Sequence, residues 1–133
     1  MRFILDCSVT LSWCFESENS AYATRILGLL ESATAVVPSL WSLEVVNGLV
    51  TGEKRGKIQA GEVADFLKRL AALNIVVEPM QPLKEDLWTY ARQFKLSSYD
   101  AFYLMMAIRL SLPLASADQA LLVAAKTSGV VVL

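Results

Sequence analysis

The chain has 133 residues, enough for a hydrophobic core of its own, and we expect a single domain over residues 1–133. Its 12 basic and 13 acidic residues give a net charge of −1, which excludes a globally basic nucleic-acid-binding protein. The sequence contains no histidine, which excludes serine–histidine and cysteine–histidine nucleophiles and histidine zinc sites. Any catalysis must therefore use carboxylates, hydroxyls, lysine, arginine or a hard metal ion.

Composition also bears on location. No apolar run approaches the roughly 20 residues of a membrane span, and the N-terminal segment has an acid at position 6 where a signal peptide would be apolar. Cys7 and Cys14 fall in one predicted helix, about 10 Å apart along its axis, which is too far for a disulfide. We therefore expect a cytoplasmic protein without membrane contact. Hydrophobic residues make up 55% of the chain, a surplus that suggests a partner or a second copy covers part of the surface.

Short apolar strands alternate with helices along the chain. The pattern predicts strands at 2–5, 34–38, 74–79, 112–117 and 130–133. It predicts helices at 8–15, 17–32, 40–56, 60–73, 82–94, 96–110 and 118–129. Ser17 or Asn19 should open the second helix, and Ser39 should cap the third. Short all-apolar strands are typical of a parallel sheet covered on both faces, so we expect an α/β three-layer sandwich with a central parallel sheet.

Three aspartates fall where a ligand site would form in such a sheet. Asp6 directly follows the first strand, Asp118 follows the fourth, and Asp100 begins a helix in the zone where strand ends and helix starts converge. In open α/β sheets, sites form outside the carboxyl ends of the strands. Taken singly, each acid has a structural explanation, because aspartates cap helices and are favoured near the positive end of the helix dipole.

Glu44 is harder to explain by structure alone. It lies in the predicted helix 40–56 among apolar neighbours, so we expect its side chain to face protein. An unpaired buried carboxylate either costs several kcal/mol or stays protonated. A distant lysine or arginine could pair with it, and Asn47, one turn onward, could orient it through a hydrogen bond. One divalent cation would account for all four acids together, because hard ions bind carboxylate oxygens and water.

Four segments resemble the acidic motifs of PIN-domain proteins, with the greatest likeness to VapC-type toxin ribonucleases of toxin–antitoxin modules. They are ILDCSVTLSW, PSLWSLEVVNGL, SSYDAFYLMMA and LASADQAL, in the family's order over nearly the whole chain. The resemblance implies a catalytic Mg²⁺ or Mn²⁺ site made of Asp6, Glu44, Asp100 and Asp118. It also implies accessory roles for Ser8, Ser116 and Asn47. Serine stands at 116 where the family more often has threonine, but the hydroxyl is kept. By the same resemblance we expect a homodimer and a small antitoxin that covers the acidic groove.

Other readings of these acids fit less well, except one. A phosphoaspartate receiver needs paired acids after its first strand and a lysine at the end of a late strand. This chain has only Asp6, followed by Cys7, after the first strand, and no lysine in the segment LASAD. A haloacid-dehalogenase-like phosphatase needs a second acid two residues after its nucleophile, where Ser8 stands. A PIN-like module that binds RNA or protein without cutting stays open, with its acids serving as structural caps.

The acids, together with this resemblance, lead us to expect a metal-dependent endoribonuclease that hydrolyses RNA phosphodiester bonds and leaves a 5′-phosphate and a 3′-hydroxyl. Asp6 and Asp100 are expected to be the main metal ligands, with Glu44 and Asp118 completing the site directly or through water. Four acids repel RNA phosphates, so positive charge must offset them. The metal should offset the charge of the acids, and the basic residues that could hold the RNA backbone are Lys54, Arg55, Arg92, Lys95 and Arg109.

Overall fold

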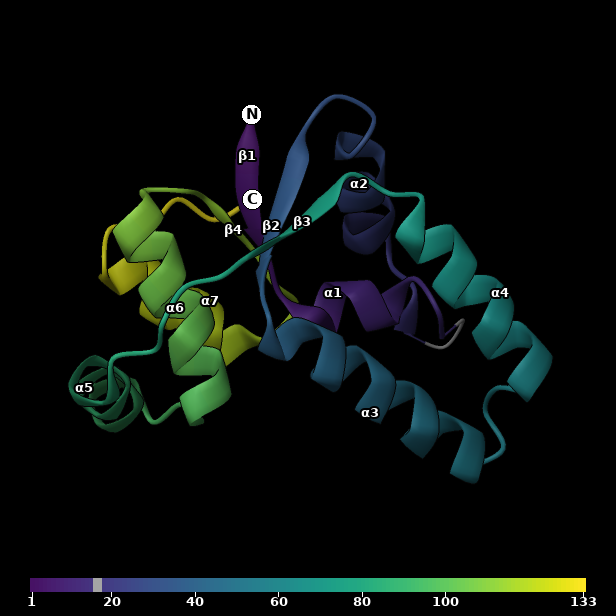
Figure 1. The fold of residues 1–133 in the computed structure, drawn as a ribbon. Helices are drawn as coiled ribbons and strands as arrows, with labels where there is room; N and C mark the ends of the chain where they lie inside the picture. Colours follow the sequence, from purple (N-terminus) through teal and green to yellow (C-terminus); the bar gives the residue numbers. More distant parts are fainter. Residues whose placement is uncertain (16–17) are drawn as a thin grey trace.

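A computed structural model describes residues 1–15 and 18–133, and within them a four-stranded parallel sheet lies between two layers of helices (Figure 1). The strands are β1 (Arg2–Leu5), β2 (Thr34–Pro38), β3 (Ile75–Glu78) and β4 (Leu114–Ala115). Their spatial order is β3-β2-β1-β4, and each neighbouring pair is parallel. β1 is an inner strand, and its Phe3, Ile4 and Leu5 side chains are fully buried.

Helices cover both faces of this sheet. They are α1 (Cys7–Ser12), α2 (Ala21–Leu29), α3 (Leu40–Lys54), α4 (Ala60–Ala71), α5 (Lys84–Phe94), α6 (Ser98–Leu110) and α7 (Gln119–Thr127). Figure 1 shows α1 to α4 on one side of the strands and α5 to α7 on the other, as right-handed crossovers require for this strand order. The predicted α/β three-layer sandwich is confirmed. None of the described helices is both long enough and apolar enough to cross a membrane.

The predicted strand at 130–133 is wrong. In that segment the chain makes one isolated parallel bridge, between Leu114 and Val132. β4 has only two residues, so it offers too short a template for a longer ladder. Ser39 does occupy the N-cap position of α3, as predicted, but its backbone angles are helical and its side chain makes no capping hydrogen bond.

The start of α2 also differs from the predicted one. The helix begins at Ala21, and Ser20 caps it by accepting a hydrogen bond from the backbone N–H of Ala23 at 3.1 Å. Asn19 is therefore not the cap, and Ser17 lies outside the described residues. The first helix is shorter than predicted as well, because α1 ends at Ser12.

Two glycines let α3 pack closely against α1 and the residues that follow it. A Cβ atom built on Gly48 would lie 2.6 Å from the side chain of Leu11, and one on Gly52 would lie 2.5 Å from the ring of Phe15. No larger residue fits at these separations without displacing its neighbour. Gly48 lies one turn after Glu44, so the same close packing holds the pocket end of α3 beside α1.

The substitution Gly52→Ala tests this packing. Helix propensity would favour alanine by about 1 kcal/mol, but the rigid Phe15 ring has to move, and overpacking of this kind costs about 1–3 kcal/mol. We expect a net loss of unfolding free energy in urea denaturation. Gly28→Ala in α2 is the matched control, because nothing lies within 4 Å of its added methyl group, and it should be neutral or stabilising. Equal stability of Gly52→Ala and the wild type would contradict the packing argument.

Candidate functional site

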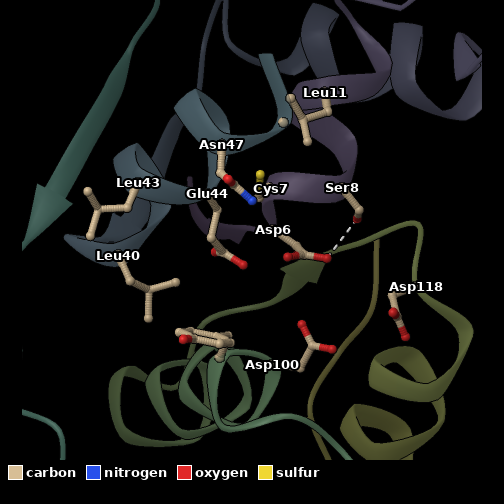
Figure 2. A pocket seen from close by; sticks show the side chains of 12 residues that line it. Asp6, Cys7, Ser8, Leu11, Leu40, Leu43, Glu44, Asn47, Asp100 and Asp118 are labelled. Atoms are coloured by element: carbon tan, nitrogen blue, oxygen red, sulfur yellow. Dashed lines mark hydrogen bonds between the residues drawn. The ribbon is translucent and has the colours of Figure 1, made fainter. Parts of the chain in front are cut away.

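A pocket of about 700 Å³ lies at the carboxyl ends of β1 and β4, where α3, α6 and α7 also begin or pass. It is lined by Ser8 and Asn47 and by all four predicted acids, which are Asp6, Glu44, Asp100 and Asp118. Figure 2 shows the carboxylates of Asp6, Glu44 and Asp100 facing a common space, with Asp118 at its edge near Ser8. The fold thus gathers side chains from four separate segments of the chain into one acidic cavity.

Asp6 is the most buried of these acids, with 3% of its surface exposed. The hydroxyls of Ser8 and Ser116 both donate to its Oδ2 atom, at 2.7 and 2.8 Å. Each hydroxyl in turn accepts a backbone N–H at 3.0 Å, Ser8 from Ala117 and Ser116 from Asp118, so their single protons are directed at Asp6. Burial raises the pKa of Asp6 in spite of these two bonds, which act to lower it. Both side-chain hydrogen bonds thus go to Oδ2, and Oδ1 accepts none from the side chains of the described residues.

Glu44 is half-buried and receives a hydrogen bond from the hydroxyl of Tyr103, at 2.7 Å from its Oε1. Burial is the main cause that raises the pKa of Glu44 to about 7, and the charges of Asp6 and Asp100 add to it, while the bond from Tyr103 acts to lower it. The expected hydrogen bond from Asn47 is not found in the described part of the chain, although Asn47 does line the pocket.

Asp100 and Asp118 differ in what their carboxylates do. Ser97 caps α6 by accepting the backbone N–H of Asp100 at 3.1 Å, so the Asp100 carboxylate is not the cap. Burial, followed by the charges of Asp6 and Asp118, raises the pKa of Asp100 to about 6. Asp118 does cap its helix, because its Oδ1 accepts the N–H of Leu121 at 3.0 Å. Helix capping therefore accounts for one carboxylate oxygen of Asp118, but it does not account for the carboxylate of Asp100.

No basic side chain neutralises this group of acids within the described residues. The ion pairs found there are Arg2 with Glu78 and Arg109 with Asp86, and neither reaches the pocket. The salt bridge considered for Glu44 is thus absent from the described chain. Asp6 also raises the pKa values of Glu44 and Asp100, so the acids repel one another as well as being desolvated.

A family model for the PIN domain matches residues 3–127 of the chain. The chain belongs to the PIN domain family. PIN domains are typically metal-dependent nucleases. No curated protein matches the sequence.

Two solved structures are similar to this PIN domain in fold. One is the crystal structure of PAE2754 from Pyrobaculum aerophilum, with a TM-score of 0.71 and 22% sequence identity over 93% of this chain and 84% of that chain. The other is the PilT N-terminus domain protein SSO1118 from Sulfolobus solfataricus P2, with a TM-score of 0.50 and 20% identity over 100% of this chain and 86% of that chain.

The donor set of the pocket suits a hydrated hard cation. In residues 1–15 and 18–133, no group of three or more His, Cys, Asp or Glu side chains stands close enough together to hold a metal ion as it is. Mg²⁺ does not require such a cage, because it commonly takes one or two carboxylates and keeps several waters. Cys7 also lines the pocket, but burial raises the pKa of its thiol, and a protonated thiol is not a ligand.

The sequence did not single out Tyr103, whose hydroxyl contacts Glu44. The side chain is fully buried, and burial followed by the Glu44 contact raises the pKa of its phenol, so it stays a donor. The available signal is local: Tyr103 lies three residues after Asp100, and residues at that spacing share one face of a helix.

Stability of the metal-free protein should depend on pH. The folded-state pKa values of Glu44, about 7, and Asp100, about 6, lie above the ordinary values of 4.5 and 3.8. Their stabilising protonation is complete below about pH 4 and is lost as pH rises through 6 and 7. In EDTA we expect the melting temperature to fall between about pH 5 and pH 8, and less so for Glu44→Gln. A wild type whose melting temperature falls no more than that of Glu44→Gln would contradict this.

Proposed function

We propose that this PIN domain is a metal-dependent endoribonuclease, the toxin of a type II toxin–antitoxin system, with Mg²⁺ or Mn²⁺ as its cofactor. The observation that carries the proposal is the convergence of four carboxylates from four segments in one cavity, with no basic partner within the described chain. A protein that only used these acids as helix caps would not need Glu44 and Asp100 to share a cavity with Asp6.

The proposed site contains residues that bind the cation and residues that hold those ligands in place. Asp6 and Asp100 are proposed as the main ligands, with Glu44 and Asp118 reaching the ion through water or positioning the attacking water. A divalent cation held there would offset phosphate charge and lower the pKa of a bound water. Ser8 and Ser116 hold Oδ2 of Asp6, while Oδ1 accepts no side-chain hydrogen bond from the described residues. Hydrolysis would leave a 5′-phosphate and a 3′-hydroxyl.

The substrate proposed is RNA, whose backbone must approach an acidic cavity. Lys54, Arg55, Arg92 and Lys95 are exposed and available for phosphate contacts. Arg109 is less suited than the sequence suggested, because its guanidinium is bonded to Asp86 at 2.9 Å. If these cations hold the backbone, cleavage should weaken as salt concentration rises.

Two protein partners are proposed: a second copy of the chain and a cognate antitoxin that covers the groove. Exposed apolar side chains support such interfaces, since a free surface rarely keeps many of them together. On α3, Leu43 is 75% exposed and Val46 and Val50 are also exposed, and Leu43 lines the pocket. A cytoplasmic location is proposed too, in agreement with the two free cysteines, Cys7 and Cys14.

Cleavage of structured RNA by purified wild type and Asp100→Asn, each with Mg²⁺, Mn²⁺ or EDTA, tests the proposal. The wild type should cut only with metal, and the variant should lose about 100-fold or more in rate, at least as much as the loss of one preorganised catalytic donor. Asp65→Asn, which alters an exposed acid on α4, is the matched control and should cut like the wild type.

Two outcomes would contradict the proposal. If the wild type and Asp100→Asn bind RNA or a partner equally and neither cuts, the chain is the non-cleaving binding module that the sequence left open. If Asp100→Asn cuts as fast as the wild type, the activity does not come from this pocket.

A further inference from the structure

Tyr103 combines complete burial with a polar contact to the acidic pocket. It lies in the middle of α6, where residues 101–107 are all buried, and its own exposed fraction is 0%. Its hydroxyl donates a hydrogen bond to Oε1 of Glu44 at 2.7 Å, joining α6 to α3. Phenylalanine would fill a purely apolar position equally well, so packing alone does not account for the hydroxyl.

The bond restricts a side chain that would otherwise be mobile. A glutamate has several rotatable bonds and many rotamers, and Glu44 is only half-buried, on the wall of an open cavity. The buried Tyr103 ring is held by its neighbours and offers one proton in a fixed direction. Glu44 Oε1 is therefore held, while Oε2 receives no side-chain hydrogen bond from the described residues.

Helix geometry couples Tyr103 to another acid. Asp100 and Tyr103 are three residues apart on α6, so their side chains project from the same face. One helix thus supplies both Asp100 and the donor that holds the acid on the opposite wall, Glu44. The relative position of these two carboxylates is set through a single rigid element.

Asp6 shows the same arrangement independently. The hydroxyl protons of Ser8 and Ser116 both go to its Oδ2, at 2.7 and 2.8 Å, and Oδ1 accepts no side-chain hydrogen bond from the described residues. In both acids hydroxyl donors occupy one oxygen, and the other oxygen accepts no side-chain hydrogen bond from the described residues. Carboxylates that ligate metal ions are commonly held in this way by outer hydrogen-bond donors, which fix their orientation.

We propose that Tyr103 is a positioning residue of the candidate metal site, where its hydroxyl orients Glu44 so that the free carboxylate oxygen faces the cation or its water shell. The inference rests on the metal site of the proposed function and adds to it a residue that lies outside the cavity. Tyr103 itself touches neither the ion nor the RNA.

Mn²⁺ affinity, measured by isothermal titration calorimetry on the full chain without RNA, tests the inference directly. Tyr103→Phe keeps the ring and removes only the hydroxyl, and we expect its affinity to drop roughly 10-fold or more, as for other outer donors of metal ligands. Tyr90→Phe is the matched control. Its ring packs partly buried against the core, and its hydroxyl makes no hydrogen bond among the described residues, so its affinity should equal that of the wild type.

A double variant separates positioning from general stability. In a Glu44→Ala background, adding Tyr103→Phe should not weaken Mn²⁺ binding further, because the group that Tyr103 orients is gone. A purely structural bond would instead lower the melting temperature of Tyr103→Phe and leave its Mn²⁺ affinity unchanged, which would overturn the inference while leaving the metal site intact. A wild type that binds no Mn²⁺ would overturn the metal site and the positioning role together.

A measurement on the wild-type sequence covers the case in which Tyr103→Phe does not fold. The chain has four tyrosines, so ¹⁹F NMR of protein labelled with 3-fluorotyrosine gives four resonances. Phenylalanine variants of Tyr22, Tyr90 and Tyr99 assign three of them and leave Tyr103 by elimination. Titration with Mg²⁺ should shift the Tyr103 resonance in the wild type and not in Glu44→Ala. A Tyr103 resonance that does not shift when Mg²⁺ is added, while calorimetry shows that the ion binds, would overturn the inference.

Discussion

The site depends on one buried carboxylate at the end of an inner strand. Asp6 is 3% exposed, and it is tolerated there because the hydroxyls of Ser8 and Ser116 donate to it. Those two bonds also connect the start of α1 to the segment after β4, since Ser116 lies beyond the strand that pairs with β1. The acid is therefore both a structural junction and the innermost group of the cavity.

Around Asp6 the fold places two further carboxylates, those of Glu44 and Asp100, in a half-buried cavity where their charged forms are unfavourable without a cation. Close packing at Gly48 keeps α3 against α1, and Ser97 starts α6 so that Asp100 projects into the same cavity. Burial and mutual repulsion raise the pKa values of Glu44 and Asp100. Strain of this electrostatic kind is usual at functional sites, and a divalent cation is the simplest group that would relieve it.

The sequence was sufficient for features that are encoded locally. Apolar strands and helix periodicity predict the sandwich. Acids placed just after strands or at a helix start predict the gathering of Asp6, Asp100 and Asp118 at one edge of the sheet. Contacts between distant segments were not predictable in this way. The bond from Tyr103 to Glu44, the pairing of Arg109 with Asp86, and the single bridge at Val132 all depend on how elements far apart in the chain meet.

These carboxylates are proposed to hold a divalent cation. Crystals of the wild type grown with Mn²⁺ and measured near the manganese absorption edge test this proposal most directly. We predict an anomalous peak in the cavity within bonding distance of Asp6 Oδ1 and the Asp100 carboxylate, and no such peak in Asp100→Asn crystals. Well-diffracting wild-type crystals that show Mn²⁺ elsewhere, or no Mn²⁺ between these two acids, would contradict the account.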